Sequence, residues 1–281
     1  MAETEPVIAS VVDTARWTAV YRARESERAD ALFHDVLADR LAGERGRAIA
    51  AQTARLLSSG WPVVARTKLI DDLVLAAVEN GCDRVLSIAA GFDTRPYRLA
   101  LPPELVWVEA ELPELLEEKE RLLADEQPRC VLRRSRVDLS DAQARAAFLD
   151  EALAGASKAL VVTESLVMYL APEDVRQLAD DLRRPEITGW VVDVASKAVA
   201  RMVARGSRDL LRNAPFKFMP DNGIGFFEDH GWSVAEIEPV MKAANRFRRL
   251  PPLLRLYSLF PQPNLRKSGR LPWTAVALLR P

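Results

Sequence analysis

The sequence predicts a single α/β domain, residues 1–281, built on a doubly wound, mostly parallel β-sheet. From residue 82 onward, short apolar segments alternate with segments of helical periodicity, an order typical of β-α units. The apolar segments are nearly continuous, as expected for strands that are buried on both faces. Ligands of such sheets bind beyond the carboxyl ends of the strands, so the residues that follow each strand are candidates for a site.

The first 81 residues are predicted to form a helical cap. Three segments with helical periodicity end at a glycine, a residue that commonly terminates helices. These segments are 25–43, 46–60 and 67–81.

Residues 82–196 are predicted to form the core half of the sheet, which would bind the ligand. Strands are expected at 84–90, 105–110, 130–137, 158–163 and 189–195. Helices are expected at 113–125, 141–155 and 171–184. Pro113 and Pro172 stand at helix starts, where the missing N–H costs nothing.

Residues 197–222 lack a strong period, and they are predicted to form a lid insertion. They contain Phe216, Phe218 and Met219, which suit either an aromatic ligand or a loop that covers the core. Residues 223–281 are then expected to complete the sheet, with a last strand near 273–280.

The composition is that of a soluble globular protein, with 49% apolar and 28% charged residues. The net charge of −1 hides an asymmetry, because no acid follows Glu238 whereas residues 239–281 carry nine Lys or Arg. This basic end would attract an anionic ligand, or it is an ordinary solvated and locally paired surface. We expect a cytoplasmic protein without a membrane or nucleic-acid partner, because signal-peptide, membrane-spanning and nucleic-acid-binding patterns are absent.

Metal and disulfide chemistry are not expected. Cys82 and Cys130 have no metal-type spacing and form no disulfide framework, and His34 and His230 are far apart in the sequence.

The segment VLSIAAGFDTRPYRL, residues 85–99, ends a strand with the small-residue turn Ala89-Ala90-Gly91. Such a turn lets a ligand approach the backbone closely. The dinucleotide fingerprint G-x-G-x-x-G would need two further glycines, and Asp93 stands where a pyrophosphate would be repelled. The turn therefore disfavours a nicotinamide nucleotide and favours a cofactor with positive charge or N–H donors, such as a sulfonium nucleoside.

Acids also follow the next three strands. Glu109 and Glu111 end the second strand, where a carboxylate can accept both hydroxyls of a ribose. Asp138 ends the third strand and could accept from an adenine amino group, with Leu139 beside the ring, and Glu164 ends the fourth. Each acid alone also fits a helix cap or a solvated turn. Four successive strands that end near an acid indicate a nucleoside site.

Several motifs occur in the order found in the leucine carboxyl methyltransferase family. They are YRARESERADALF (21–33), ARTKLIDD (65–72), LSIAAGFDTRPYRL (86–99), VWVEAELPELLEEK (106–119), VDLSD (137–141) and TESLVMYL (163–170). The chain resembles the bacterial branch of this family, which includes polyketide carboxyl methyltransferases such as the tetracenomycin enzyme. The resemblance implies a Rossmann-like class I methyltransferase fold with S-adenosyl-L-methionine (SAM) as the methyl donor.

The resemblance also implies roles for individual residues. It places Arg66 and Arg22 on the SAM carboxylate, and Gly91 under the amino-acid part with Asp93 nearby. Glu111, where the family usually has aspartate, would bind the ribose hydroxyls. Asp138 and Leu139 would frame the adenine, and Glu164 would face the amino group. Two departures are Ala89, which replaces the usual first glycine, and residues 34–38, which lack the family's proline.

Arg66 also has an independent argument. A zwitterionic methionine end needs a cationic partner, and arginine pairs with a carboxylate in a bidentate manner. We expect the helix before the first strand to end near the ligand, within reach of it; the alternative is a surface arginine.

Methyl transfer from a sulfonium is an in-line displacement that mainly requires alignment and exclusion of water. A carboxylate acceptor is already ionised at pH 7, whereas a phenol, with a pKa near 10, usually needs a base such as histidine. The scarcity of histidine therefore favours a carboxyl acceptor. Tyr169 would line the acceptor side, or it is core packing. Arg246 or Arg248 would orient an anionic acceptor.

The preferred hypothesis is a SAM-dependent O-methyltransferase that acts on a carboxyl group of an anionic or aromatic small molecule in secondary metabolism. The alternatives are methylation of a phenolic hydroxyl or another acceptor, a nicotinamide-dependent oxidoreductase, and a non-catalytic nucleoside-binding protein. The oligomeric state is left open.

Overall fold

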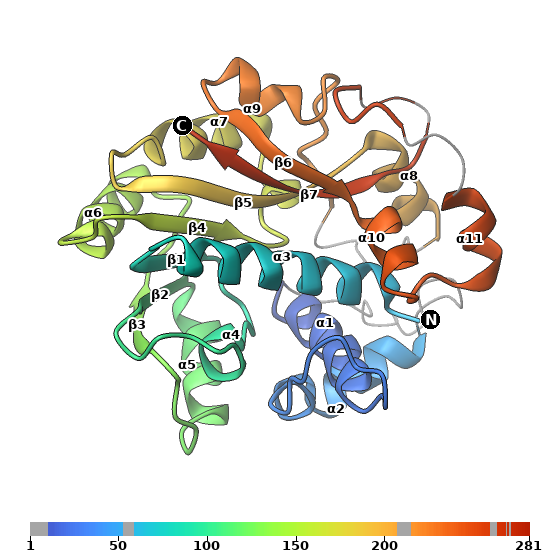
Figure 1. The fold of residues 1–281 in the computed structure, drawn as a ribbon, viewed down its shortest axis with the longest axis horizontal. Helices are drawn as coiled ribbons and strands as arrows, with labels where there is room; N and C mark the ends of the chain where they lie inside the picture. Colours follow the sequence, from blue (N-terminus) through green and yellow to red (C-terminus); the bar gives the residue numbers. More distant parts are fainter. Residues whose placement is uncertain (1–10, 53–58, 207–214, 259–262, 268, 270) are drawn as a thin grey trace, which may run out of the picture.

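The computed structural model describes residues 11–52, 59–206, 215–258, 263–267, 269 and 271–281. Within these ranges seven strands form one sheet in the order β3-β2-β1-β4-β5-β7-β6 (Figure 1). They are Arg84–Ile88 (β1), Val106–Glu111 (β2), Val131–Arg136 (β3), Ala159–Thr163 (β4), Ile187–Ala195 (β5), Ser233–Pro239 (β6) and Thr274–Arg280 (β7). Strands β1 to β5 pair in parallel, and β7 runs antiparallel to both neighbours. The predicted doubly wound fold is confirmed, and each expected strand is found.

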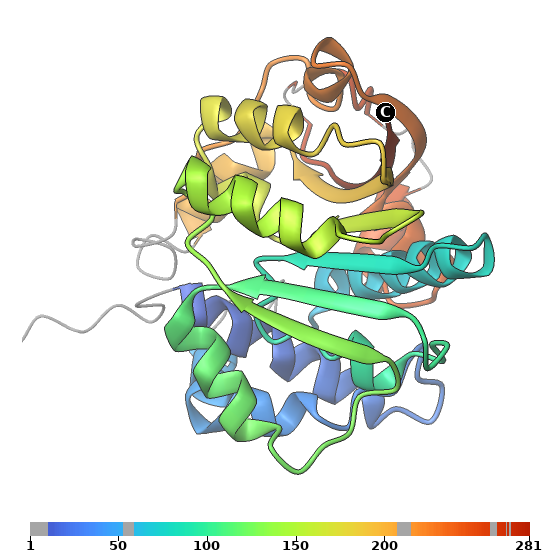
Figure 2. The same cartoon turned by 90° about the vertical axis from the view of Figure 1, so that its left-hand side faces the viewer.

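Helices cover both faces of the sheet (Figure 2). On one face lie α3 (Trp61–Glu79) and α10 (Val240–Arg246), whose apolar side chains pack on β1, β4 and β7. On the other lie α6 (Ala142–Leu153), α7 (Pro172–Asp181) and α9 (Gly225–Asp229). A third cluster joins α1 (Val11–Ser26), α2 (Ala38–Gln52) and α5 (Pro113–Leu122). The remaining helices are α4 (Arg95–Arg98), the 3-10 helix η1 (Val167–Tyr169), α8 (Lys197–Gly206) and α11 (Pro252–Ser258).

The predicted cap helix over 25–43 is wrong, because α1 ends at Ser26 and residues 27–37 form an irregular loop. Side chains at the end of α1 hold this loop: Glu25 accepts from the N–H of Leu32 at 2.8 Å, and Ser26 Oγ accepts from the N–H of Asp35 at 2.7 Å. Helical periodicity is thus overridden by local side-chain hydrogen bonds. Gly43, with φ +58° and ψ −171°, is non-helical and separates two helical parts of α2, so the helical stop predicted at this glycine is found.

Helix α3 begins at Trp61, six residues before the expected start, and ends at Glu79, two residues before the predicted Gly81. The N–H of Cys82 bonds to the carbonyl of Ala77, and Gly81 has φ +85°. This is the glycine-terminated helix end that the sequence indicated.

The segment 197–222 is more regular than expected, because its first part forms α8. Residues 207–214 lie outside the described residues. Beyond them, the N–H of Lys217 donates to the carbonyl of Met168 at 2.8 Å, which ties the chain to η1. Phe218 is 3% exposed and packs on Phe226 and Phe227, so it belongs to the core and not to a lid.

The basic C-terminal end is in part locally paired. Arg246 pairs with Glu238, Arg249 with Glu25, and Arg266 with Glu228. For these three arginines the interpretation as an ordinary paired surface is confirmed. In the described part of the chain, no helix has both the length and the apolar character that a bilayer span requires.

Candidate functional site

A cavity of about 330 Å³ opens at the carboxyl ends of β1 to β4, covered by α1 and the start of α3. The residues that the resemblance assigns to the cofactor line it, together with Tyr169 of the acceptor side: Arg22, Arg66, Ala89, Gly91, Asp93, Glu111, Asp138, Leu139, Glu164 and Tyr169. The structure thus brings together residues from α1, α3 and the ends of four strands. We call this space the cofactor cavity.

The floor of the cofactor cavity is the turn after β1. Gly91 has φ +47°, and its N–H donates to Glu111 Oε2 at 2.7 Å, which joins the ends of β1 and β2. Ala89 has φ +55°, so it keeps the left-handed conformation that a glycine would adopt at lower cost. Burial raises the pKa of Glu111. The turn therefore has the form expected from the sequence, with some strain at Ala89.

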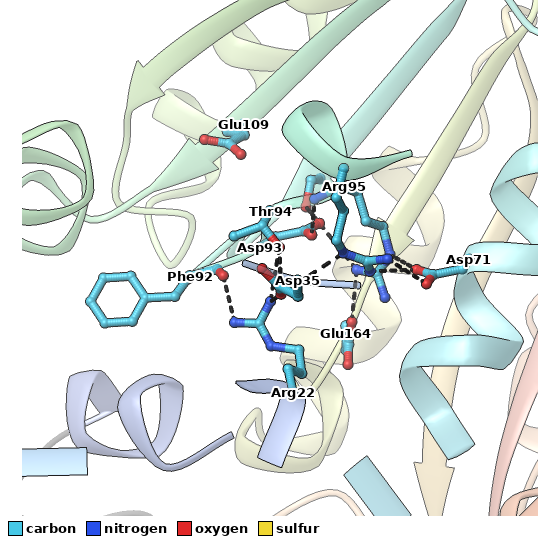
Figure 3. Close-up of polar contacts among 12 residues, drawn as sticks. Arg22, Asp35, Asp71, Phe92, Asp93, Thr94, Arg95, Glu109 and Glu164 are labelled. Carbon is cyan, nitrogen blue, oxygen red and sulfur yellow. Dashed lines mark hydrogen bonds and ion pairs between the residues drawn. The ribbon is translucent and has the colours of Figure 1, made fainter. Parts of the chain in front are cut away.

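A buried arginine, Arg95, organises the acids around this turn (Figure 3). Its side chain is 2% exposed, and Nη1 lies 3.1 Å from Asp93 and 2.9 Å from Glu164. Nε donates to Asp71 at 2.7 Å, and Asp71 also pairs with Arg98. Burial alone would raise the pKa of Asp93, but the charge of Arg95 and then of Lys119 holds it at about 2. Asp93 is therefore an ionised group that binds Arg95 first.

Arg66 lies between two carboxylates. Its Nε donates to Glu164 at 2.9 Å and its Nη1 to Asp193 at 3.0 Å. Within the described residues, Nη2 forms no hydrogen bond, so one face of the guanidinium is left for a ligand. The expectation that the end of the helix reaches the site is wrong. Arg66 stands near the start of α3, because β1 follows the helix at once and runs back toward the cavity.

Asp193 also holds the turn that follows β4. Its Oδ1 accepts the N–H of Ser165 at 2.7 Å, and Ser165 has φ +57°, a left-handed conformation rare for serine. Burial raises the pKa of Asp193, although Arg66 lowers it. For Glu164, burial is outweighed by Arg95 and Arg66, so its pKa is lowered. Asp193 thus binds Arg66 directly and also holds the backbone next to Glu164 through the N–H of Ser165.

Arg22 lines the cofactor cavity, and its guanidinium binds other parts of the chain. It donates from Nη1 to Asp35 at 2.7 Å and from Nη2 to the carbonyl of Phe92 at 2.7 Å. It therefore links α1 to the turn that follows β1 and to the loop over residues 27–37. A direct contact of Arg22 with a ligand carboxylate stays a prediction.

The far end of the cavity is more open and more apolar. Asp138 is exposed, and its Oδ1 accepts from the N–H and hydroxyl of Ser140, at 2.9 and 2.7 Å. Apolar side chains here are Leu139, Leu166, Leu170 and Leu178. The arrangement suits a flat ring with a polar edge.

Several sequence candidates lie elsewhere. Glu109 is fully buried and pairs with Lys119 and Arg134, at 2.7 and 3.0 Å, apart from the network of Figure 3. His34 is exposed outside the cavity lining, and His230 is structural, with Nδ1 2.6 Å from the carbonyl of Phe226.

The aromatic and basic candidates for the acceptor side are mostly outside the cavity lining as well. Phe216 contacts the site only through its edge-on packing with Tyr169, at 5.5 Å between ring centroids. Burial raises the pKa of Tyr169 to about 12. Arg246 and Arg248 do not line the cofactor cavity.

The sequence analysis missed Arg95, Asp71, Asp35 and Asp193. Asp193 obeys the rule that identified the other acids, because it stands near the end of β5. Nothing in the sequence pairs Arg95 with Asp71, 24 residues away.

The residues present fit a zwitterionic nucleoside. Arg95 Nη2 and Thr67 Oγ1 are buried at the cavity lining without a hydrogen-bond partner among the described residues, and buried polar groups normally have one. Arginine next to carboxylates suits an amino-acid end, Glu111 suits a diol, and the leucines suit a ring. The volume is within the range of small-molecule sites, roughly 300–1,000 Å³.

Comparisons with known proteins agree with this description. The family model of leucine carboxyl methyltransferases matches residues 15–183. A protein of Parafrankia sp. (strain EAN1pec), assigned by name to the SAM-dependent methyltransferases, is 30% identical, with 86% of this chain and 83% of the relative covered. One of Mycobacteroides abscessus, with the same assignment, is 32% identical, with 84% and 88% covered.

Solved structures are similar in fold. A DUF574 family protein from Streptomyces avermitilis superimposes with a TM-score of 0.59 at 16% identity, covering 95% of this chain and 96% of that one. A protein from Thermobifida fusca gives 0.55 at 14% identity, covering 98% and 96%. The family model, the relatives and the cofactor cavity lead to one conclusion: the chain belongs to the leucine carboxyl methyltransferase family of SAM-dependent methyltransferases.

Proposed function

We propose that this methyltransferase methylates a carboxylate oxygen of a small-molecule acceptor. The observation that carries the proposal is the absence of histidine, the commonest general base, among the described residues that line the cofactor cavity. Glu164, a carboxylate of the lining, is paired with both Arg66 and Arg95. An acceptor carboxylate needs no proton removed at pH 7, whereas a phenol does.

The same contacts support a binding mode for SAM. Bound SAM supplies an electrophilic methyl group on a sulfonium sulfur. Arg66 Nη2 and Arg95 Nη2 have no partner among the described residues and would donate to the methionine carboxylate, while Glu164 accepts from the amino group. Glu111 would accept from the ribose hydroxyls. Asp138 and Leu139 would hold the adenine.

Tyr169 would act as a hydrogen-bond donor on the acceptor side. Its pKa of about 12 keeps the hydroxyl protonated at neutral pH, so it can donate to a carboxylate but is a poor base. Phe216 packs edge-on against its ring and fixes the orientation. An aromatic or polyketide-like acid would stack against these rings.

The test uses methyl-labelled SAM with pairs of aromatic acceptors that differ only in a carboxyl or a phenolic hydroxyl group. The proposal predicts labelled product from the acid, released by mild alkali as expected for an ester. It also predicts a kcat/KM that changes little from pH 6 to 9. An alkali-stable product, or a rate that rises with pH on the phenol alone, contradicts a carboxyl acceptor.

A further inference from the structure

A second cavity, of about 430 Å³, is lined by α1, the start of α3, the segment that joins α10 to α11, and α11 itself. Five arginines line it: Arg24, Arg28, Arg248, Arg249 and Arg255. We call it the arginine cavity. It shares no lining residue with the cofactor cavity, because α1 and α3 present different residues to the two spaces.

The positive charge of the arginine cavity is only partly neutralised. Glu25 in its wall is bound by Arg249 at 2.8 Å, and Asp30 pairs with Arg28 and Arg249, at 2.9 and 3.1 Å. In the described ranges Arg28 and Arg249 share these two carboxylates, so the charges of Arg248 and Arg255 are not neutralised by them.

Arg248 and Arg255 carry the part of this charge that faces no acid. Neither has a carboxylate within 4.0 Å in the described part of the chain, and Arg255 is held by one bond from Nε to the carbonyl of Leu250, at 3.1 Å. Both side chains are exposed, so solvent and solutes reach them.

The backbone at Arg248 gives a second, independent observation. Arg248 has φ +59° and follows the last turn of α10, where the N–H of Arg249 bonds to the carbonyl of Ala244 at 2.8 Å. Glycine is the favoured residue at such a position, and an L-residue there is strained. Strained residues that persist are often functional. Here the strain accompanies a side chain that lines the arginine cavity.

We propose that the arginine cavity binds a small anionic ligand through a phosphate or carboxylate group, with Arg248 and Arg255 as the main donors. The planar guanidinium matches both groups and binds them through paired hydrogen bonds. Tyr21, Trp61 and Pro251 provide an apolar wall for the rest of the ligand. Because the two cavities have no residue in common, this ligand and SAM bind together.

The test is titration calorimetry of the full chain with pyrophosphate and, separately, citrate, at constant ionic strength. We expect saturable 1:1 binding of at least one anion, and the two arms show whether phosphate or carboxylate is preferred. Arg248→Gly should weaken binding about tenfold or more, the effect of losing a charge-assisted hydrogen bond. The matched control, Arg246→Ala, removes an exposed arginine at the end of α10, two residues before Arg248, that pairs with Glu238 and does not line the cavity.

The Gly variant separates binding from folding, because glycine suits the left-handed backbone. Its Tm should equal or exceed that of the unmodified protein, and its affinity for SAM should be unchanged. Equal anion affinity in Arg248→Gly and the unmodified protein overturns the proposal, as does the lack of saturable binding of both anions. A parallel loss of SAM affinity in Arg248→Gly contradicts the independence of the two cavities.

Discussion

The ion pair between Asp93 and Arg95 makes a specific contribution to stability that depends on pH. The pKa of Asp93 is lowered from 3.8 to about 2, so the folded state binds its proton less tightly than the unfolded chain. For an acid with a lowered pKa, the stabilisation is present above the unfolded pKa and is lost as pH falls through the folded one. The shift corresponds to about 2 kcal/mol at pH 7, and roughly half of this remains at pH 3.

Asp93→Asn removes this charge and keeps the shape of the side chain. We expect the variant to be less stable by about 2 kcal/mol at pH 7 and by about 1 kcal/mol at pH 3. The assay is urea unfolding at pH 7, 5 and 3, followed by circular dichroism. Asp125→Asn is the control, because Asp125 is exposed and its side chain forms no ion pair or hydrogen bond in the described residues. A stability difference for Asp93→Asn that stays constant over this range refutes the assigned pairing.

Three further predictions concern the turns and the site. Asp193→Ala removes the acceptor for the N–H of Ser165. Ser165→Gly should therefore raise the free energy of unfolding by about 0.5–1 kcal/mol more in the Asp193→Ala background than in the unmodified protein. Equal effects of Ser165→Gly in the two backgrounds, measured by urea unfolding, contradict the supporting role of Asp193. Ala89→Gly should change the free energy of unfolding by about 0 to +1 kcal/mol, because the relief of left-handed strain is opposed by the greater entropy of the unfolded chain. A decrease of more than about 1 kcal/mol in the same assay contradicts strain at Ala89. Glu111→Ala should weaken calorimetric binding of SAM more than that of a 2′,3′-dideoxy analogue, whereas equal losses argue against a ribose contact.

Much of the sheet could be predicted because its signals are local. Continuous apolar strands and proline at two helix starts predicted β1, β2, β4, β5, α5 and α7 to within a few residues. The acids of the site were predictable for a topological reason, since parallel strands bring their carboxyl ends to one edge. Asp93, Glu111, Asp138 and Glu164 therefore meet in one cavity although they are spread over 72 positions, from 93 to 164.

The rest depended on contacts between segments that are distant in the sequence. Glu109 and Glu111 look alike in the sequence and share one face of β2, because they are two residues apart. Glu109 lies before the carboxyl end of the strand, where Lys119 and Arg134 pair with it, whereas Glu111 is the last residue of β2 and binds the N–H of Gly91 in the turn. The 27–37 loop is held by bonds of Glu25 and Ser26, which periodicity does not reveal. Asp193 was missed although it followed the rule applied to the other strand ends.

The central claim is that the cofactor cavity binds SAM, with Arg66 holding its carboxylate. The most direct measurement is titration calorimetry of the protein and of Arg66→Ala against SAM and its demethylated product, with NAD and NADP as controls. The account predicts 1:1 binding of the two sulfur nucleosides alone, and an affinity for SAM that falls about tenfold or more in the variant. Unchanged SAM affinity in Arg66→Ala, or binding of a nicotinamide nucleotide in place of SAM, would contradict it.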